Sequence, residues 1–456
     1  MLKGEITAFL SLTFILLTSF ILGVTEAAAI QAQKSKSRAD TDAAVYSLFG
    51  EYQKELFQSY GIFGIEGSYG TGNLEEQNLI RRLNYYGTSG IRHEIEAIQY
   101  LTDNQGQAFR EQALAVMEQE TGVSEIKEIT GQTRRWEEQE VAGEQALEKG
   151  EALLKDFREV LPDGKELTDL GSENPFIFVD EVEKSGILAM VLPEDYQLSG
   201  KQIRVEDQPS SRNRNTGRGT VPAKKNSDGM EEKLLLSRYM SERFQNALSE
   251  QEKNRSLSYE IEYLIFGKSS DRENLEKTVE KLFLIRMGVN YTFLFTDQAK
   301  QEEAAAAALT ITSLLAVPEA QEIAKQAILA AWAVGESIID LRALLAGKKV
   351  ALVKTQENWQ LSLSGLMTLR SNSDVSEEEG SASGMSYEDY LRLLLCFKDS
   401  KELSMRALDR IEQNIIFEEK LSFFRVDYCV TKIKLRNQAQ VGGNFTYEFP
   451  VYFGYL

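Results

Sequence analysis

The residues that could do chemistry in this sequence are few, and their spacing does not match a reaction site. The segment Gly267-Lys268-Ser269 ends like a phosphate-binding P-loop, in which backbone N–H groups and a lysine hold phosphate oxygens. That motif needs a glycine five residues before Gly267, and the residue there is Glu262. We therefore expect no nucleotide site at this position.

The segment 380–384, Gly-Ser-Ala-Ser-Gly, has the spacing of the sharp turn that presents a nucleophilic serine in hydrolases. Its central residue is Ala382, which cannot act as a nucleophile. The surrounding sequence SDVSEEEGSASG is rich in Ser, Gly and Glu, which is typical of a loop. We therefore expect a loop and no nucleophile here.

One histidine and two cysteines narrow the chemistry further. His93 is the single histidine, so most histidine-based metal sites and triads are excluded. Because charged residues flank it, we expect His93 on the surface of a helix, and neither a ligand nor a base. Cys396 lies in an apolar helical segment and Cys429 in a strand. We expect two buried thiols in preference to a disulfide, although an extracytoplasmic location would permit a pair.

Composition excludes further classes of function. The 456 residues include 70 acidic and 51 basic side chains, giving a formal net charge of -19, which argues against a nucleic-acid surface. Carboxylates are so frequent that no pair stands out as a glycosidase dyad. We therefore expect a non-catalytic protein without a cofactor or metal. A hydrophobic content of 42% is sufficient for a substantial core.

An uncharged segment near the N-terminus is the most informative part of the sequence. Residues 6–25, ITAFLSLTFILLTSFILGVT, contain no charged side chain. As a helix rising about 1.5 Å per residue, this segment is roughly 30 Å long, the thickness of a bilayer's hydrocarbon core. Its hydroxyl side chains can bond to the preceding turn: Thr7, Ser11, Thr13, Thr18 and Ser19. The sequence predicts that this segment spans a membrane.

The helical pattern continues beyond the membrane segment. Residues 26–60 contain no proline, and we expect one helix to run to about Tyr60, where Gly61 ends it. A cleaved signal peptide would have a shorter apolar region and a small-residue cleavage site, which Ala27, Ala28 and Ala29 could supply. Continuity with the stem favours a retained anchor, so we expect residues 1–60 to form a transmembrane anchor and helical stem.

The charges around the span give a weak signal for orientation. Lys3 and the amino terminus precede the span, whereas Lys34, Lys36 and Arg38 follow it. Counted simply, these charges would place the C-terminal body in the cytoplasm. The rule is weakened because the basic residues begin nine residues past the span and are closely followed by Asp40 and Asp42.

Several segments resemble a family of membrane-anchored proteins of Gram-positive bacteria whose genes accompany the Tad (tight adherence) pilus machinery. The similar segments are residues 3–17, 25–70, 256–291, 330–350 and 357–363. More distantly, the anchor is similar to TadE- and TadG-like pseudopilins. The resemblance implies an extracytoplasmic body held by the N-terminal helix, against the simple charge count. It implies no reaction.

The anchor departs from the pilin pattern in one respect. Prepilin peptidases cut after a glycine and leave a glutamate at the fifth position of the mature chain. Gly4 is in place, but the fifth residue beyond it is Phe9, so polymerisation as a major pilin is not expected. Glu26 lies at the edge of the span, where it either reaches headgroup water or pairs across a homo-oligomeric anchor bundle.

The rest of the chain predicts an α+β fold in three further parts. Residues 61–203 form an acidic, mainly helical domain, with a clear helix over 134–161 and short strands within 176–193. The glutamates are expected to form a solvated face, and a surface for a basic partner is the alternative. Residues 204–232 are rich in Pro, Ser, Asn and Gly and predict a flexible linker. Its basic residues could instead contact an anionic wall polymer: Arg212, Arg214, Arg218, Lys224 and Lys225.

Residues 233–456 are expected to form an α+β domain. Alternating apolar residues over 257–265 predict a strand, and Ser270 or Asp271 is expected to cap a long helix. Two apolar stretches within 304–335 are too short to span a membrane and predict buried core helices. A further helix is expected from 386 to 419. The chain then ends in a β-hairpin that turns at Gly442-Gly443.

These observations predict an accessory or assembly component of a Tad-type pilus that is anchored in the cell membrane and positions protein partners. A cell-envelope sensor or wall-polymer-binding protein unrelated to pili is the alternative. A carboxylate-dependent hydrolase without a recognisable motif is the third choice.

Overall fold

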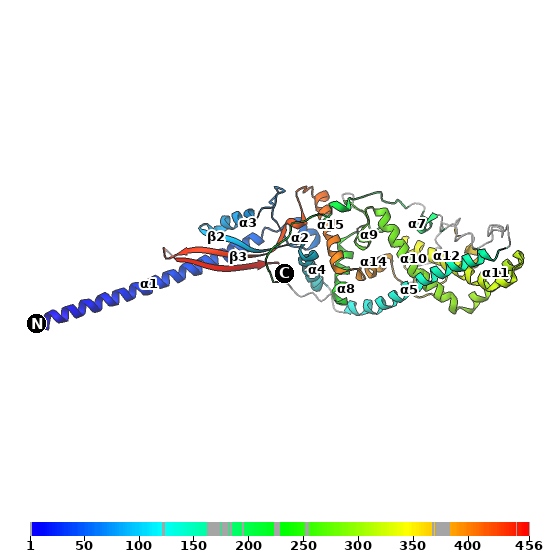
Figure 1. The fold of residues 1–456 in the computed structure, drawn as a ribbon, viewed down its shortest axis with the longest axis horizontal. Coiled ribbons are helices and arrows are strands. Elements are labelled where there is room, and N and C mark those ends of the chain that lie inside the picture. The colour runs from blue at the N-terminus through cyan, green and yellow to red at the C-terminus, as the bar shows by residue number, and fades with distance from the viewer. Residues whose placement is uncertain are drawn as a thin grey trace. The chain divides into compact units, whose positions relative to one another are not determined.

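The protein is described by a computed structural model, and its fold is α+β, as the sequence predicts (Figure 1). The described residues are 2–120, 124–161, 175, 182, 185–193, 196–222, 229–250, 255–366, 369, 384–443 and 445–455. They divide into two compact units. Unit 1 comprises residues 1–116, 207–227 and 407–456, and unit 2 comprises residues 117–206 and 228–406. These units differ from the predicted domains at 61–203, 204–232 and 233–456, because segments distant in sequence complete unit 1.

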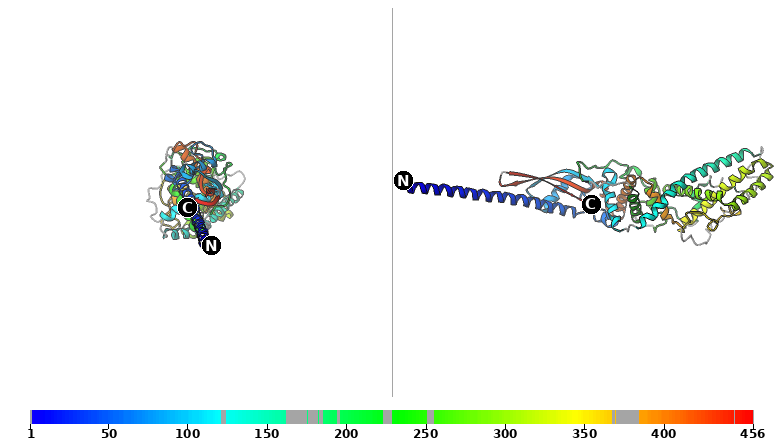
Figure 2. Two further views of the ribbon diagram at one scale, coloured as in Figure 1. Left: turned by 90° about the vertical axis from the view of Figure 1, so that its left-hand side faces the viewer. Right: turned by 90° about the horizontal axis from the view of Figure 1, so that it is seen from below.

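Unit 1 is built around the long N-terminal helix α1 (Leu2–Phe49). The right-hand view of Figure 2 shows its first half projecting free, while its second half lies beside the sheet. The helix does not continue to Tyr60 as predicted. It ends at Gly50, and the Gln53 N–H bonds to the Gly64 carbonyl before the short helix α2 (Lys54–Tyr60) begins. Gly61 then ends α2 in the left-handed conformation, with φ 67°, as expected.

The sheet of unit 1 is antiparallel. The long strand β3 (Cys429–Val441) pairs with β2 (Ile91–Tyr100) on one side, and with β1 (Ile65–Glu66) and β4 (Phe445–Gly454) on the other. The predicted C-terminal hairpin is confirmed, since Val441 lies opposite Phe445 across the Gly442-Gly443 turn. The remaining helices of this part are α3 (Glu76–Leu83), α4 (Asp103–Glu120), which begins in unit 1, the π-helical turn η1 (Asn84–Thr88) and the 3₁₀ turn η5 (Val426–Tyr428).

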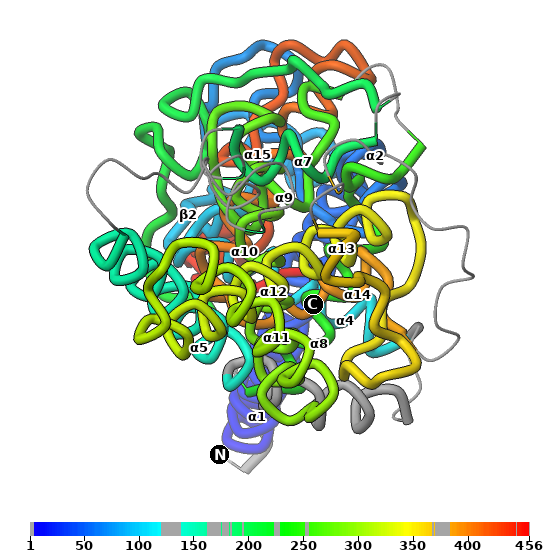
Figure 3. Tube along the Cα trace, turned by 90° about the vertical axis from the view of Figure 1, so that its right-hand side faces the viewer, coloured from blue at the N-terminus to red at the C-terminus, as the bar shows by residue number. Residues whose placement is uncertain are grey.

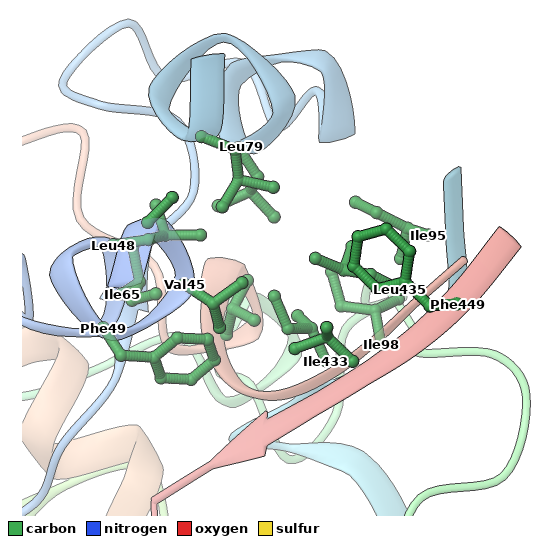
Figure 4. Close-up of a cluster of buried hydrophobic side chains, with 14 of the residues drawn as sticks. Val45, Leu48, Phe49, Ile65, Leu79, Ile95, Ile98, Ile433, Leu435 and Phe449 are labelled. Carbon is green, nitrogen blue, oxygen red and sulfur yellow. The ribbon is translucent and has the colours of Figure 1, made fainter. Parts of the chain in front are cut away.

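The core of unit 1 lies between α1 and the sheet. Val45, Leu48 and Phe49 face strand residues such as Ile98 and Ile433, and all five are buried (Figure 4). Full burial of side chains of this size stabilises by roughly 1.5–3 kcal/mol each. The packed half of α1 is therefore an integral part of the folded unit.

Two segments of unit 1 differ from the sequence prediction. Residues 91–100 form β2, not a helix, because inward-facing Ile91, His93 and Ile95 alternate with outward-facing charged residues. Residues 204–222, predicted as a flexible linker, instead hold fixed contacts within unit 1 from Asp207 onward, and they include the 3₁₀ turn η3 (Val205–Asp207). Arg218 forms a β-bridge with Ile98. The segment is ordered by ion pairs and backbone bonds, although it has few apolar residues to bury.

Unit 2 is mainly helical. Helices α5 (Ser124–Glu159), α10 (Asp271–Thr296), α11 (Gln298–Leu315) and α12 (Gln321–Leu345) pack side by side (Figure 3). The predicted helix over 134–161 is confirmed within α5. A Cβ on Gly143 of α5 would lie 1.8 Å from the Leu284 carbonyl oxygen, and one on Gly288 of α10 would lie 2.3 Å from the Gln139 oxygen. These glycines allow the two backbones to touch.

Other helices complete unit 2: α7 (Ile187–Val191), α8 (Met230–Arg243), α9 (Glu260–Phe266), α13 (Leu363–Leu366), α14 (Tyr387–Cys396), the 3₁₀ turn η4 (Pro318–Ala320) and the start of α15 (Ser400–Glu418). Ser270 caps α10 by accepting a hydrogen bond from the Glu273 N–H, as predicted. The predicted helix over 386–419 is two helices, because Asp399 accepts bonds from the Lys401 and Glu402 N–H groups and starts α15.

Three predictions in unit 2 are wrong. Residues 257–265 are not a strand, because they lead into α9 and are buried on every side, including Glu260 and Glu262. Residues 187–191 form α7 instead of a strand, and most of 176–184 lies outside the described residues. Helix α12 is buried as expected, but α11 buries only one face, with Leu314 68% exposed.

Candidate membrane anchor and polar sites

The apolar side chains in the first half of α1 are exposed, and the described part of the chain buries none of them. Phe14, Leu16 and Phe20 are each nearly 70% exposed, at 69%, 68% and 68%. Hydroxyls bond back to the helix as predicted, with Thr13 and Thr18 donating to the Phe9 and Phe14 carbonyls at 2.9 and 2.8 Å. By length and composition the helix can cross a membrane, and a secretory signal would share these properties.

The second half of α1 ties the anchor to the hairpin. The Gly442 N–H donates to Gln33 Oε1 at 2.8 Å, close to the end of the apolar segment. The Lys34 amine lies 5.3 Å from the centre of the Tyr447 ring. At the other end, the Tyr455 hydroxyl donates to the Phe49 carbonyl at 2.5 Å. These contacts hold the second half of α1 to the sheet along its length. The apolar first half is part of the same unbroken helix.

His93 is buried in β2, in contrast to the predicted surface position. Its Nδ1 lies 2.7 Å from Asn437 Oδ1 and its Nε2 lies 2.7 Å from Thr88 Oγ1. Burial lowers the pKa of His93 and outweighs the opposing effect of the Asn437 hydrogen bond. Both ring nitrogens are satisfied by neutral partners, so the imidazole connects β2, β3 and the preceding turn.

A polar groove of about 700 Å³ lies along β2 in unit 1. Its walls carry acidic and basic side chains that already pair with one another. Arg218 pairs with Glu76, and Glu96 pairs with Lys434 and Arg436. Because these charges are matched within the groove, it has no excess charge with which to hold an anion or a cation.

The basic residues of segment 204–222 are also occupied. The Arg212 guanidinium pairs with Glu412 and donates to Asp427 at 2.6 Å. Arg214 donates to the Pro209 carbonyl at 2.7 Å, and Arg218 forms the ion pair of the groove. Lys224 and Lys225 lie outside the described residues. In the described part, the predicted basic centre holds unit 1 together and leaves little free charge for a polymer.

The P-loop-like segment is a helix cap. Gly267 ends α9 with φ 64°, and the Asn274 side chain accepts from the Lys268 N–H at 2.8 Å. The Arg406 side chain packs against Gly267, where an added Cβ would lie 2.6 Å from its Nε atom. Of the segment 380–384, only Gly384 is among the described residues.

Both cysteines are free and buried, as predicted. The Cys396 thiol lies 3.2 Å from the Ser237 hydroxyl. Burial raises the pKa of both Cys396 and Cys429, so neither thiol is an activated nucleophile. Among the described residues, no cluster of three or more His, Cys, Asp or Glu side chains could hold a metal ion.

Sequence reasoning missed two buried charged sites in unit 2. Arg286, Glu336, Asp340 and Lys354 meet between α10, α12 and the segment that follows. Their only signal in the sequence is that single charged residues interrupt apolar helices, as in AVGESIIDLRALL. Glu262 is the second case, buried in α9 with a pKa that burial raises to about 7.

Comparison with known proteins gives one family match. The family model DUF5702, a family of unknown function, matches residues 165–441. No curated protein and no solved structure matches the chain.

Proposed function

The chain belongs to the DUF5702 family, whose function is unknown, and we propose that it is a membrane-anchored, extracytoplasmic accessory or assembly component of a Tad-type pilus. In this proposal residues 6–25 cross the cell membrane once and the body lies outside the cell. The protein positions partner subunits and does not catalyse a reaction.

The observation that carries the proposal is the division of α1 into a bare apolar half and a packed half. The apolar side chains of the charge-free segment 6–25 are exposed, and lipid or another apolar helix would cover them. The packed half belongs to the core of unit 1, so a force or a displacement at the membrane reaches the sheet directly. This is the arrangement that a positioning role requires.

An outward orientation rests on the resemblance to the Tad-associated family. The opposing charge count depends on Lys34, Lys36 and Arg38. In unit 1, Lys34 packs over Tyr447 and therefore has a role in the fold that does not depend on topology. Small residues at Ala27, Ala28 and Ala29 are exposed and would allow close packing of neighbouring anchors in a homo-oligomer.

Deletion of the gene tests the pilus role. We expect the deletion strain to lose its surface pili and the full chain to restore them. A variant in which an unrelated span followed by a flexible stem takes the place of residues 6–25 should not restore them. A matched control replaces residues 6–25 alone with an unrelated span. Unchanged piliation in the deletion strain would contradict the proposal.

Co-purification separates the pilus role from wall binding. After chemical cross-linking and detergent extraction, the proposal expects pilus subunits to be recovered with the chain. Recovery of anionic wall polymer without pilus subunits would favour the envelope-binding alternative.

A further inference from the structure

Four charged side chains meet in the interior of unit 2, which is an expensive arrangement for a protein core. Arg286 and Glu336 are 0% exposed, Asp340 is 1% and Lys354 is 5%. Arg286 comes from α10, Glu336 and Asp340 come from successive turns of α12, and Lys354 comes from the segment after α12. Replacing such a group by apolar residues is often neutral or stabilising, so packing alone does not account for it.

The Lys354 amine touches both carboxyl groups. Its Nζ lies 2.5 Å from Glu336 Oε1 and 2.8 Å from Asp340 Oδ1. It also donates to the Asn358 carbonyl at 3.3 Å. A nitrogen and a carboxyl group are thus held in contact, in a place that water does not reach.

The two carboxyl groups have different surroundings. Arg286 Nε donates to Asp340 Oδ2 at 2.9 Å, and Asn290 donates to the same oxygen at 3.0 Å. Burial raises the pKa of Asp340, but the charges of Arg286 and Lys354 outweigh it and hold the pKa below its usual value. Asp340 is therefore kept ionised, and its contact with Nζ holds the Lys354 amine in place beside Glu336.

Glu336 lacks an arginine partner and faces backbone donors instead. The Gln360 N–H donates to Oε1 at 3.0 Å and the Leu361 N–H donates to Oε2 at 2.8 Å. Burial raises the pKa of Glu336 above its usual value despite the nearby Lys354. A neutral carboxyl group is the form that an amine can attack, and the backbone N–H that is bonded to its carbonyl oxygen can stabilise the negative charge that forms there during attack.

We propose that Lys354 and Glu336 condense autocatalytically to form an isopeptide bond inside unit 2. The Lys354 ammonium group passes one proton to the Glu336 carboxylate, which leaves a neutral amine beside a neutral carboxyl group, and the amine attacks the Cδ carbon of Glu336. The Nζ–Cδ bond forms and the Cδ–O bond to the hydroxyl breaks. That hydroxyl leaves with a second proton from Nζ as one water molecule. The ammonium and carboxylate groups together become one amide and one water molecule, so atoms and charge balance without an oxidant or a cofactor.

The bond would fasten α12 to the segment that follows it. The Trp332 indole N–H already donates to the Leu361 carbonyl at 2.9 Å, so this segment lies against α12 before any reaction. A covalent link between Glu336 and Lys354 would hold this contact through denaturation. This inference concerns unit 2 alone and does not depend on the pilus proposal.

Mass spectrometry of the full chain extracted from membranes tests the inference. The intact mass is expected to be smaller than the sequence mass of the same mature chain by one water molecule. Peptide mapping is expected to find Lys354 joined to Glu336. An intact mass without this loss, or a link to Asp340, would overturn the inference.

Matched variants test the assigned roles. Lys354→Arg keeps the positive charge but removes the nucleophile, so its chain should keep the full mass. Lys349→Arg, five residues away in sequence, should still lose water. The Asp340→Asn variant should lose no water, or lose it at least tenfold more slowly than the wild type, in a time course after synthesis. Water loss from the Lys354→Arg variant at the wild-type rate would contradict the proposal.

Discussion

The interface between α1 and the sheet in unit 1 and the interface between α10 and α12 in unit 2 are held in different ways. The first joins apolar side chains such as Leu48, Ile98 and Ile433. The second joins apolar side chains around the charged group of Arg286 and Asp340. Truncating a side chain in an apolar interface lowers stability roughly in proportion to the atoms removed. Removing one partner of a buried charged group lowers stability more sharply, because the other charge is left buried and unpaired.

The difference indicates separate tasks. The α1 interface joins the apolar half of α1 to the folded unit, and packing alone achieves this. The α10–α12 interface buries a charge pattern that stability does not require, which indicates a further role for those residues.

Replacing Arg286 should have the largest effect. Arg286→Met removes a buried guanidinium and leaves the buried Asp340 carboxylate without its arginine partner, so unit 2 should lose about 3–5 kcal/mol. Hydrogen exchange of α10 and α12 measures this loss locally. As a control, Arg392→Ala removes a surface pair with Glu388 and should cost at most about 0.5 kcal/mol. Similar costs for both variants would remove the contrast between the interfaces.

Truncating Leu48 should have a smaller and more local effect. Leu48→Ala leaves a cavity beneath α1 and should cost about 2–5 kcal/mol, seen as faster exchange in β2 and β3. The nearby Asp42 is exposed on the same helix, so Asp42→Ala should change stability by no more than about 0.5 kcal/mol. Equal effects of the two variants would contradict the assignment of the packed face.

Glu262 should make the stability of unit 2 depend on pH. Its pKa is raised from 4.5 to about 7 by burial, while the Ala247 N–H and the Tyr387 hydroxyl donate to one oxygen and Asp271 adds negative charge nearby. The folded state therefore binds more protons than the unfolded state between these values. Stability should be highest below about pH 4.5 for this group, and should fall by about 3 kcal/mol as pH rises through 7.

The variant Glu262→Gln should remove that fall. Its amide can still accept the bonds from Ala247 and Tyr387 but does not ionise. Glu388→Gln on the surface should leave the pH dependence unchanged. If the Glu262→Gln variant keeps the wild-type dependence of stability on pH, another group causes that dependence. Thermal unfolding followed from pH 4 to 8 measures all three proteins.

The smallest effect is expected at the cap of α10. Ser270→Ala removes the bond from the Glu273 N–H and should cost about 1 kcal/mol in unit 2. Ser313→Ala lies on an exposed part of α11 and should cost about half a kcal/mol or less. Denaturant titration monitored by exchange at α10 distinguishes the two variants.

The sequence was informative where one local rule decides the structure. The charge-free run of 6–25, the cap at Ser270 and the Gly442-Gly443 turn each depend on neighbouring residues, and all three were predicted as helix, cap and hairpin. It failed where partners come from distant parts of the chain. Residues 91–100 carried a two-residue alternation, but their charged positions were interpreted as a helix surface, and His93 was misplaced with them.

Two other failures share the same cause. The alternation over 257–265 suggested a strand, yet Glu260 and Glu262 find buried donors at Gln245 and Ala247 and the segment enters a helix. The segment 204–222 lacks apolar residues and was expected to be a linker. Its order comes from Asp427 and other acidic residues about 200 positions further along the chain.

Protease shaving of cells stripped of their wall tests whether the proposed anchor faces outward. Mass spectrometry then identifies the released fragments and the mature N-terminus. For an outward-facing anchor we expect peptides from 61–456 to be released while residues 6–25 stay with the membrane, and a start at Glu5 would indicate processing after Gly4. A body that remains protected until the cells are lysed would contradict the orientation and the pilus proposal with it.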